Sequence, residues 1–176
     1  MRHFGRAVLA AALMAAVIAG PGHGAETLDP GVEAGRGPVT GLPMPRYVSL
    51  RSNEANARRG PSVTHRIDWV FKRREMPLRV VAEFEHWRRV EDAEGLGGWM
   101  HFALLSGVRT VLVQQDMTPL RLQPNDRAPV VAHLEAGVVA RVQSCEQDWC
   151  RLRTDRLRGW AERSTLWGIT PGETFD

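Results

Sequence analysis

The chain has 176 residues, of which 43% are hydrophobic and 24% are charged, and its formal net charge is +3. This composition is typical of a globular protein with enough apolar residues to build cores, and it excludes a largely disordered chain. The basic runs are short and are balanced by acidic residues, so we interpret them as solvated surface and predict no nucleic-acid partner.

The first residues have the pattern of an export signal. Arg2 and Arg6 precede an uncharged apolar run over 7–19, after which small residues follow. The run is shorter than the about 20 residues that a membrane-spanning helix needs. We therefore predict a signal peptide over 1–25, a periplasmic or secreted mature protein and no stable membrane span after cleavage. The alternative is an uncleaved membrane anchor.

The next segment, 26–45, is rich in glycine and proline and has no sustained apolar period. Such a segment buries too little surface to offset the entropy of ordering it, so we predict a flexible linker. Beyond it, short apolar or alternating runs with many β-branched residues are separated by turn residues. These runs predict strands and an all-β fold with short connections.

Landmarks of the first half recur about 60 residues later, which indicates an internal repeat. Trp87-Arg-Arg-Val90 matches Trp149-Cys-Arg-Leu152, and Gly98-Trp99 matches Gly159-Trp160. The predicted boundaries are 46–106 for the first repeat, 107–170 for the second and 171–176 for a C-terminal tail. The mature chain is therefore expected to contain two small domains.

The chain has only two cysteines, Cys145 and Cys150. In an oxidising compartment they predict a disulfide between the two arms of a tight hairpin. Their spacing is not the two-residue gap of a redox motif, and no further cysteine or nearby histidine supports a metal site. We therefore predict a structural disulfide and no bound metal.

The order of Asn56-Ala-Arg-Arg-Gly-Pro-Ser62, Trp87-Arg-Arg-Val90 and Gly98-Trp99 resembles the signature of bacterial SH3-like (Src-homology-3-like) domains. The chain is similar to an exported proteobacterial subfamily with two such domains. The resemblance implies two tandem SH3-like β-barrels after a signal peptide and a flexible linker. The second repeat departs from the signature, because Thr118-Pro-Leu-Arg-Leu-Gln-Pro124 lacks the Gly-Pro-Ser turn.

The same resemblance implies a binding module, since SH3-like barrels hold extended peptides in grooves between loops and aromatic rings. The expected partner is a peptidoglycan peptide or a periplasmic protein. If the groove lies beside the opening loop, the candidate ligand-binding residues are Arg58, Arg59, Trp69 and Trp87. Trp87 has the alternative role of a packing residue. A different interpretation makes the chain a structural or regulatory adaptor of a larger cell-envelope complex.

No catalytic motif is present in the sequence. It contains no nucleophile elbow, phosphate-binding loop or paired-histidine metal helix. A site that forms in space from Glu85, His86 and Asp92 is the enzymatic alternative. We predict a non-catalytic protein without cofactors.

Overall fold

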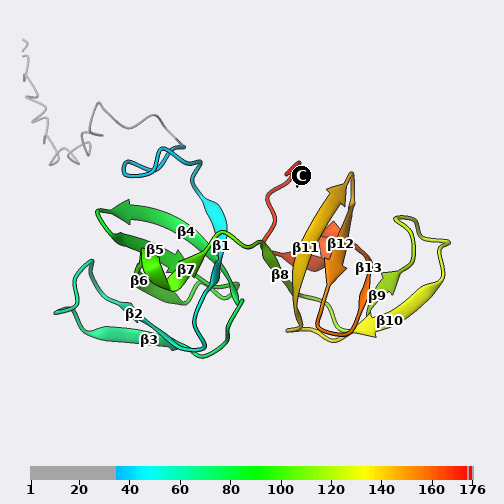
Figure 1. The fold of residues 1–176 in the computed structure, drawn as a ribbon, viewed down its shortest axis with the longest axis horizontal. Helices are drawn as coiled ribbons and strands as arrows, with labels where there is room; N and C mark the ends of the chain where they lie inside the picture. The colour runs from blue at the N-terminus through cyan, green and yellow to red at the C-terminus, as the bar shows by residue number, and fades with distance from the viewer. Residues whose placement is uncertain (1–34, 174, 176) are drawn as a thin grey trace, which may run out of the picture. The chain divides into compact units, whose positions relative to one another are not determined.

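The computed structural model describes residues 35–173 and residue 175. The predicted signal peptide over 1–25 and the beginning of the linker lie outside the described residues. The described part of the chain consists of strands and two short 3-10 helices, arranged as two antiparallel sheets (Figure 1). This confirms the predicted all-β class. Within residues 35–173, no helix is long and apolar enough to span a membrane.

The first domain is a seven-stranded sheet with the order β3-β2-β6-β5-β4-β1-β7. Its elements are β1 (Arg46–Leu50), β2 (Ala55–Arg58), β3 (Ile67–Phe71), β4 (Pro77–Phe84), β5 (Trp87–Glu91), β6 (Gly97–His101), the 3-10 helix η1 (Phe102–Leu104) and β7 (Leu105–Ser106). Consecutive strands β4, β5 and β6 pair through short hairpins. They form the centre of the sheet.

The second domain has the order β10-β9-β13-β12-β11-β8-β14, which is the same arrangement with every strand number raised by seven. Its elements are β8 (Thr110–Val113), β9 (Thr118–Arg121), β10 (Val130–Leu134), β11 (Val139–Glu146), β12 (Trp149–Arg153), β13 (Arg158–Glu162), the 3-10 helix η2 (Arg163–Thr165) and β14 (Leu166–Trp167). The identical topology confirms the predicted tandem repeat.

Neither sheet closes into a barrel, which corrects the expectation of two β-barrels. The strands at the two ends of each sheet, β3 and β7 or β10 and β14, are not paired with one another. The strands β7 and β14 contain only two residues each. A two-residue strand has few free backbone N–H and C=O groups with which to pair the strand at the other end of the sheet. Each sheet therefore remains open.

Alternation along the strands builds one core in each domain. In β5, Arg88 and Val90 point to the buried side, while Trp87, Arg89 and Glu91 lie on the other face. The first core is made of Leu50, Ala55, Ala57, Phe71, Leu78, Val80, Val90, Met100 and Leu105. The second is made of Val111, Val113, Leu120, Leu134, Ala140, Cys145, Cys150, Leu152, Ala161 and Leu166. The two cores share no residue.

The glycine of each Gly-Trp pair lies against backbone. A Cβ atom on Gly98 would be 2.6 Å from the carbonyl oxygen of Arg58, and one on Gly159 would be 2.7 Å from that of Arg121. Gly98 also has a φ of +152°, which side-chain-bearing residues rarely adopt. Both glycines therefore allow a close backbone approach that a side chain would block.

The predicted disulfide is present between Cys145 and Cys150. The two residues are directly opposite one another in the β11–β12 ladder, and both are buried. The bond therefore links the two arms of this hairpin beside Trp149.

Part of the predicted linker is folded onto the first sheet. Residues 35–45 contain an isolated bridge between Arg36 and Pro43, and their turn contacts Glu83 at the end of β4. The Glu83 carboxylate accepts hydrogen bonds from the Thr40 amide at 2.9 Å and the Thr40 hydroxyl at 2.8 Å. This half of the segment makes specific contacts instead of extending freely.

Glu75, in the turn before β4, contacts the second domain within the compact unit 31–176. Its carbonyl oxygen accepts a hydrogen bond from the Thr110 hydroxyl at 2.7 Å, and its carboxylate forms an ion pair with Arg141. The hydrogen bond from Arg141 also lowers the pKa of Glu75. Trp167, on the closing strand β14, packs edge-on against Tyr47 with ring centroids 5.1 Å apart.

Candidate functional site

Two of the four predicted ligand-binding residues lie together. Arg58 and Arg59 line a hollow of about 310 Å³ in the first domain. The aromatic ring of this hollow belongs to Trp99, which is the cross-strand partner of Arg58. Trp99 and Arg89 occupy the same cross-strand row. The hollow therefore combines an indole ring with arginines, as the prediction required, but with a different tryptophan.

Arg58 stabilises the loop that follows β2. Its Nη1 donates a hydrogen bond to the carbonyl oxygen of His65, at 2.7 Å, across the loop between β2 and β3. Arg121, the corresponding residue of the second repeat, donates in the same way to the carbonyl oxygen of Ala128 at 2.9 Å. Both guanidinium groups fasten the loop that follows their strand.

Arg59 is more accessible. Its Nε lies 3.1 Å from Asp68, and its side chain is 63% exposed. Asp68 also pairs with Arg66, and hydrogen bonds from Arg66 and Arg59 lower the pKa of Asp68. Arg89 has no ion-pair partner among the described residues and lies exposed beside Trp99. Arg59 is therefore paired with Asp68, whereas Arg58 and Arg89 form no ion pair in the described part of the chain and supply the unpaired positive charge of this hollow.

Trp69 and Trp87 lie elsewhere. Trp69 is on the edge strand β3, 40% exposed, with its ring 6.5 Å from that of Phe71 in an edge-on contact. Trp87 begins β5, and its ring lies edge-on to that of His101 at 5.7 Å. In the sheet, β2 and β6 separate β3 from β5. The structure thus does not bring these two rings into one groove.

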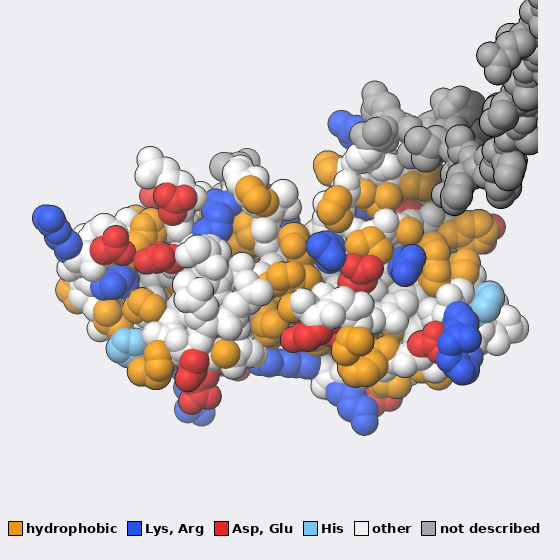
Figure 2. All heavy atoms as spheres, turned by 180° about the vertical axis from the view of Figure 1, so that it is seen from behind, with side chains coloured by type: hydrophobic (Ala, Val, Ile, Leu, Met, Phe, Trp, Pro, Cys, Tyr) orange, Lys and Arg blue, Asp and Glu red, His pale blue; other side chains and the backbone are white. Residues whose placement is uncertain are grey.

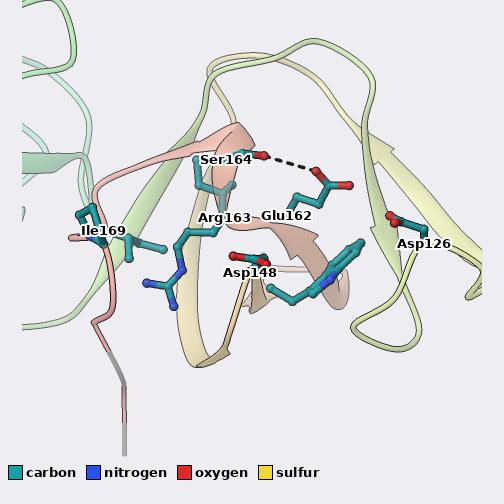
Figure 3. Close-up of a pocket in the computed structure, with 9 residues that line it drawn as sticks. Asp126, Asp148, Glu162, Arg163, Ser164 and Ile169 are labelled. Atoms are coloured by element: carbon teal, nitrogen blue, oxygen red, sulfur yellow. Dashed lines mark hydrogen bonds between the residues drawn. The ribbon is translucent and has the colours of Figure 1, made fainter.

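The second domain contains a larger hollow, of about 640 Å³, beside the β11–β12 turn (Figure 3). Trp149, one of its lining residues, is the repeat equivalent of Trp87, so the hollow corresponds to the surroundings of Trp87 in the first domain. The lining residues are Asp126, Asp148, Trp149, Glu162, Arg163, Ser164, Leu166, Ile169 and Pro171. Elements distant in sequence therefore meet here: the β9–β10 loop, the β11–β12 turn and the segment after β13.

Acidic groups dominate this hollow. Asp126, Asp148 and Glu162 all line it, and Figure 3 shows the Glu162 carboxylate directed towards Ser164. Glu162 accepts a hydrogen bond from the Ser164 hydroxyl at 3.3 Å. Within the described part of the chain, neither aspartate carboxylate lining the hollow forms an ion pair.

The arginine of the hollow does not neutralise these carboxylates. The Arg163 guanidinium donates to the carbonyl oxygens of Thr170 and Glu173, at 3.2 and 3.1 Å, and so extends towards the C-terminal segment. An indole ring flanked by unpaired carboxylates suits an ammonium or guanidinium group, which both partners attract. The arrangement can hold a cationic group of a ligand.

Sequence reasoning missed Asp148 and Glu162. Asp148 directly precedes Trp149, and Glu162 is the cross-strand partner of Trp149. The repeat alignment contained the necessary signal, since it pairs these residues with His86 and His101 around Trp87. The alignment does not give the register of β12 against β13. This register places Glu162 beside the Trp149 ring.

Asp92 is separated from Glu85 and His86 by the length of β5, so the three side chains do not come together. Asp92 is buried in the β5–β6 turn, where its Oδ1 accepts hydrogen bonds from the amides of Glu94 and Leu96. His86 instead contacts the rings of His101 and Phe102. Among residues 35–173 no group of three or more His, Cys, Asp or Glu side chains is arranged to hold a metal ion.

Charge is otherwise mixed over the surface. Figure 2 shows Lys and Arg side chains interspersed with Asp and Glu on the face that it presents. This agrees with the interpretation of the short basic runs as solvated surface.

The comparison with family models agrees with the tandem arrangement. The model of the bacterial SH3 domain family matches residues 51–107 and again 114–168. No curated protein matches the chain. Among solved structures, NlpC2 from Trichomonas vaginalis is 11% identical with a TM-score of 0.33, over 70% of this chain and 48% of that one. NlpC1 from the same organism is 12% identical with a TM-score of 0.33, over 78% and 51%. The matched part spans about half the length of these two proteins.

Proposed function

Because the chain belongs to the bacterial SH3 domain family, whose members are binding modules, we propose that it is a non-catalytic binding module of the cell envelope. Its ligand is a cell-wall peptide or a segment of a periplasmic protein that carries a free amino group. The amino group occupies the hollow beside Trp149 in the second domain.

The observation that carries this proposal is the chemistry of that hollow. It offers about 640 Å³ beside an indole ring, and its carboxylates at Asp126 and Asp148 have no ion-pair partners among the described residues. An ammonium group placed there gains charge-assisted hydrogen bonds as well as attraction to the ring face. The side chains of Leu166 and Ile169 give the neighbouring part of the ligand an apolar wall.

An extracytoplasmic location is part of the proposal. The basic and apolar N-terminus has the pattern of an export signal. The disulfide between Cys145 and Cys150 supports the same location, because such bonds persist in oxidising compartments.

The test is retention of the purified, oxidised chain on intact peptidoglycan sacculi, compared with sacculi whose amino groups have been acetylated. We expect saturable retention on the untreated sacculi and weaker retention after acetylation. The double variant Asp148→Asn, Glu162→Gln should bind untreated sacculi about tenfold more weakly, since it loses charge-assisted contacts. Glu135→Gln, an exposed carboxylate outside the hollow in the same domain, is the matched control and should bind normally.

Equal retention before and after acetylation, or by the double variant, would contradict the assignment of the hollow. A discrete protein captured from a periplasmic extract equally well by the unaltered chain and by the double variant, with no retention on sacculi, would favour the adaptor role instead. The exposed apolar residues of β3, Ile67 and Trp69, are the surface that such a protein would contact.

A further inference from the structure

The first domain has an exposed group of rings that the proposed peptide site does not use. We call it the aromatic platform, and it consists of Phe84, His86, Trp87, His101 and Phe102. The rings of His101 and Phe102 are 4.9 Å apart, those of His86 and Phe102 5.8 Å, and those of Trp87 and His101 5.7 Å.

Strand register places three of these side chains in one row. Phe84 is the cross-strand partner of Trp87, and Trp87 is the partner of His101. Directly opposite residues lie on the same face of a sheet. The row faces away from the core, because Trp87 alternates with the buried Arg88 and Val90.

Phe84, His86 and Phe102 of the platform are exposed, and Trp87 and His101 are half-buried. Phe84 is 49% exposed and Phe102 is 48% exposed. Isolated exposed apolar residues are common on protein surfaces, but contiguous exposed rings mark a binding surface.

Hydrogen bonds from the buried side of the sheet fix the backbone that carries the rings. Arg88 is buried, and its Nη1 donates to the carbonyl oxygens of Glu85 and Trp87, each at 2.8 Å. Its guanidinium carbon lies 6.0 Å from the centre of the Phe102 ring. The Phe102 amide also donates to the carbonyl oxygen of His86 at 2.9 Å. A surface ordered before binding loses little conformational entropy when a ligand arrives.

None of the five side chains carries a permanent charge. The nearby Arg88 charge is paired with Glu83, at 3.4 Å. The Nδ1 atom of His101 accepts a hydrogen bond from the Ala103 amide at 3.3 Å, so in the neutral ring the proton is on Nε2, which is then a donor. The platform therefore offers ring faces and imidazole hydrogen bonds, but no ionic contact.

The second domain differs at every corresponding position except the tryptophan. Glu146 and Glu162 flank Trp149 in the same cross-strand row. Asp148 replaces His86, and Arg163 replaces Phe102. Two domains of one topology therefore present a neutral aromatic surface and a charged one. The difference in chemistry points to ligands of different charge.

We propose that the aromatic platform binds sugar rings of an uncharged polysaccharide strand. The face of an aromatic ring is electron-rich, so it attracts the polarised C–H groups on the apolar face of a pyranose. The imidazole nitrogens of His86 and His101 are donors and acceptors that match sugar hydroxyls. None of the five side chains is a carboxylate, although the exposed Glu85 lies between Phe84 and His86 in the chain, so an amine-bearing peptide meets less negative charge here than beside Trp149.

The test is a calorimetric titration of the full chain with chitohexaose, a soluble uncharged oligosaccharide of β-linked N-acetylglucosamine. We expect saturable binding to the unaltered protein, and binding roughly tenfold weaker or more for Phe102→Ala, since an exposed ring in contact with a ligand dominates such affinities. His86→Ala should weaken binding as well. Both side chains are exposed, so circular dichroism should show folded variants.

The matched control is Arg163→Ala, at the position in the second domain that corresponds to Phe102; it should bind chitohexaose as the unaltered protein does. No titration by the unaltered protein, or equal affinity in both folded platform variants, would overturn the proposal. Binding of a proline-rich peptide at the platform in place of the sugar would also overturn it. The double variant Asp148→Asn, Glu162→Gln should retain chitohexaose binding, so the outcomes for the two sites are separable.

Discussion

Glu83 shows how one buried charge fixes a segment that the sequence assigned to a linker. Its side chain has no exposed surface, and Arg46 lies 2.6 Å from its carboxylate. The amides of Val39 and Thr40 also donate to this carboxylate, at 3.1 and 2.9 Å. A buried carboxylate is tolerated only when such partners replace its water. The turn within 35–45 therefore depends on Glu83.

The first prediction concerns acid stability. Burial raises the pKa of Glu83, but the hydrogen bonds from Thr40 and the ion pair with Arg46 outweigh it and lower the pKa from 4.5 to about 2. Because the folded-state pKa lies below the unfolded one, the carboxylate stabilises the fold above about pH 4.5, and this contribution is lost as the pH falls towards 2. Urea unfolding of Glu83→Gln should show a shallower loss of stability over that range than the unaltered protein.

At pH 7 the same variant should be less stable by about 3 kcal/mol, because Arg46 and Arg88 lose a buried partner. The control is Glu91→Gln, which breaks the partly exposed pair with Arg79 and should cost less than about 1 kcal/mol. Identical acid profiles for Glu83→Gln and the unaltered chain would show that the ionised carboxylate does not hold the turn.

At the scale of the element, β6 and β13 depend on a glycine that lets two strands approach. Gly98→Ala should reduce the free energy of unfolding by at least about 2 kcal/mol, since the new methyl group meets the Arg58 carbonyl and the backbone conformation is strained. Gly159→Ala should reduce the free energy of unfolding by less than Gly98→Ala does, because residue 159 has the steric conflict but not the positive φ. Thermal unfolding of the two variants measures the difference.

Gly107→Ala is the control for these substitutions, since no atom lies within 4 Å of the added Cβ. Its stability should stay within about 0.5 kcal/mol of the unaltered protein. If Gly98→Ala were as stable as the unaltered protein, strands β2 and β6 would be able to move apart to accommodate the methyl group. Packing would then not require a glycine at this position.

At the scale of the whole molecule, the two domains have separate cores. The double variant Cys145→Ala, Cys150→Ala should therefore destabilise the second domain by about 2 kcal/mol, the chain-entropy contribution of so short a loop. Hydrogen exchange should accelerate in β11–β13 and remain unchanged in β4–β6. Reduction of the unaltered protein with dithiothreitol should reproduce this pattern.

Equal acceleration in both domains would mean that they unfold as one unit. The contacts of Glu75 with Thr110 and Arg141, together with the ring contact of Tyr47 with Trp167, would then transmit the loss of stability between the domains.

The sequence by itself determined the all-β class, the tandem repeat and the disulfide. These features follow from local information: alternation along a strand, the order of Trp and Gly-Trp landmarks, and the short spacing of Cys145 and Cys150. The spacing of landmarks also located both tryptophans, Trp87 and Trp149, around which the two proposed sites are built.

Only the tertiary structure decided which side chains surround those tryptophans. Glu162 meets Trp149, and His101 meets Trp87, through the register of two strands, which a single sequence does not specify. Tertiary contacts also decided that Trp99, rather than Trp69, joins Arg58. The same is true of Glu83, whose partners are about 40 residues away in sequence and become neighbours only when the turn packs on the sheet.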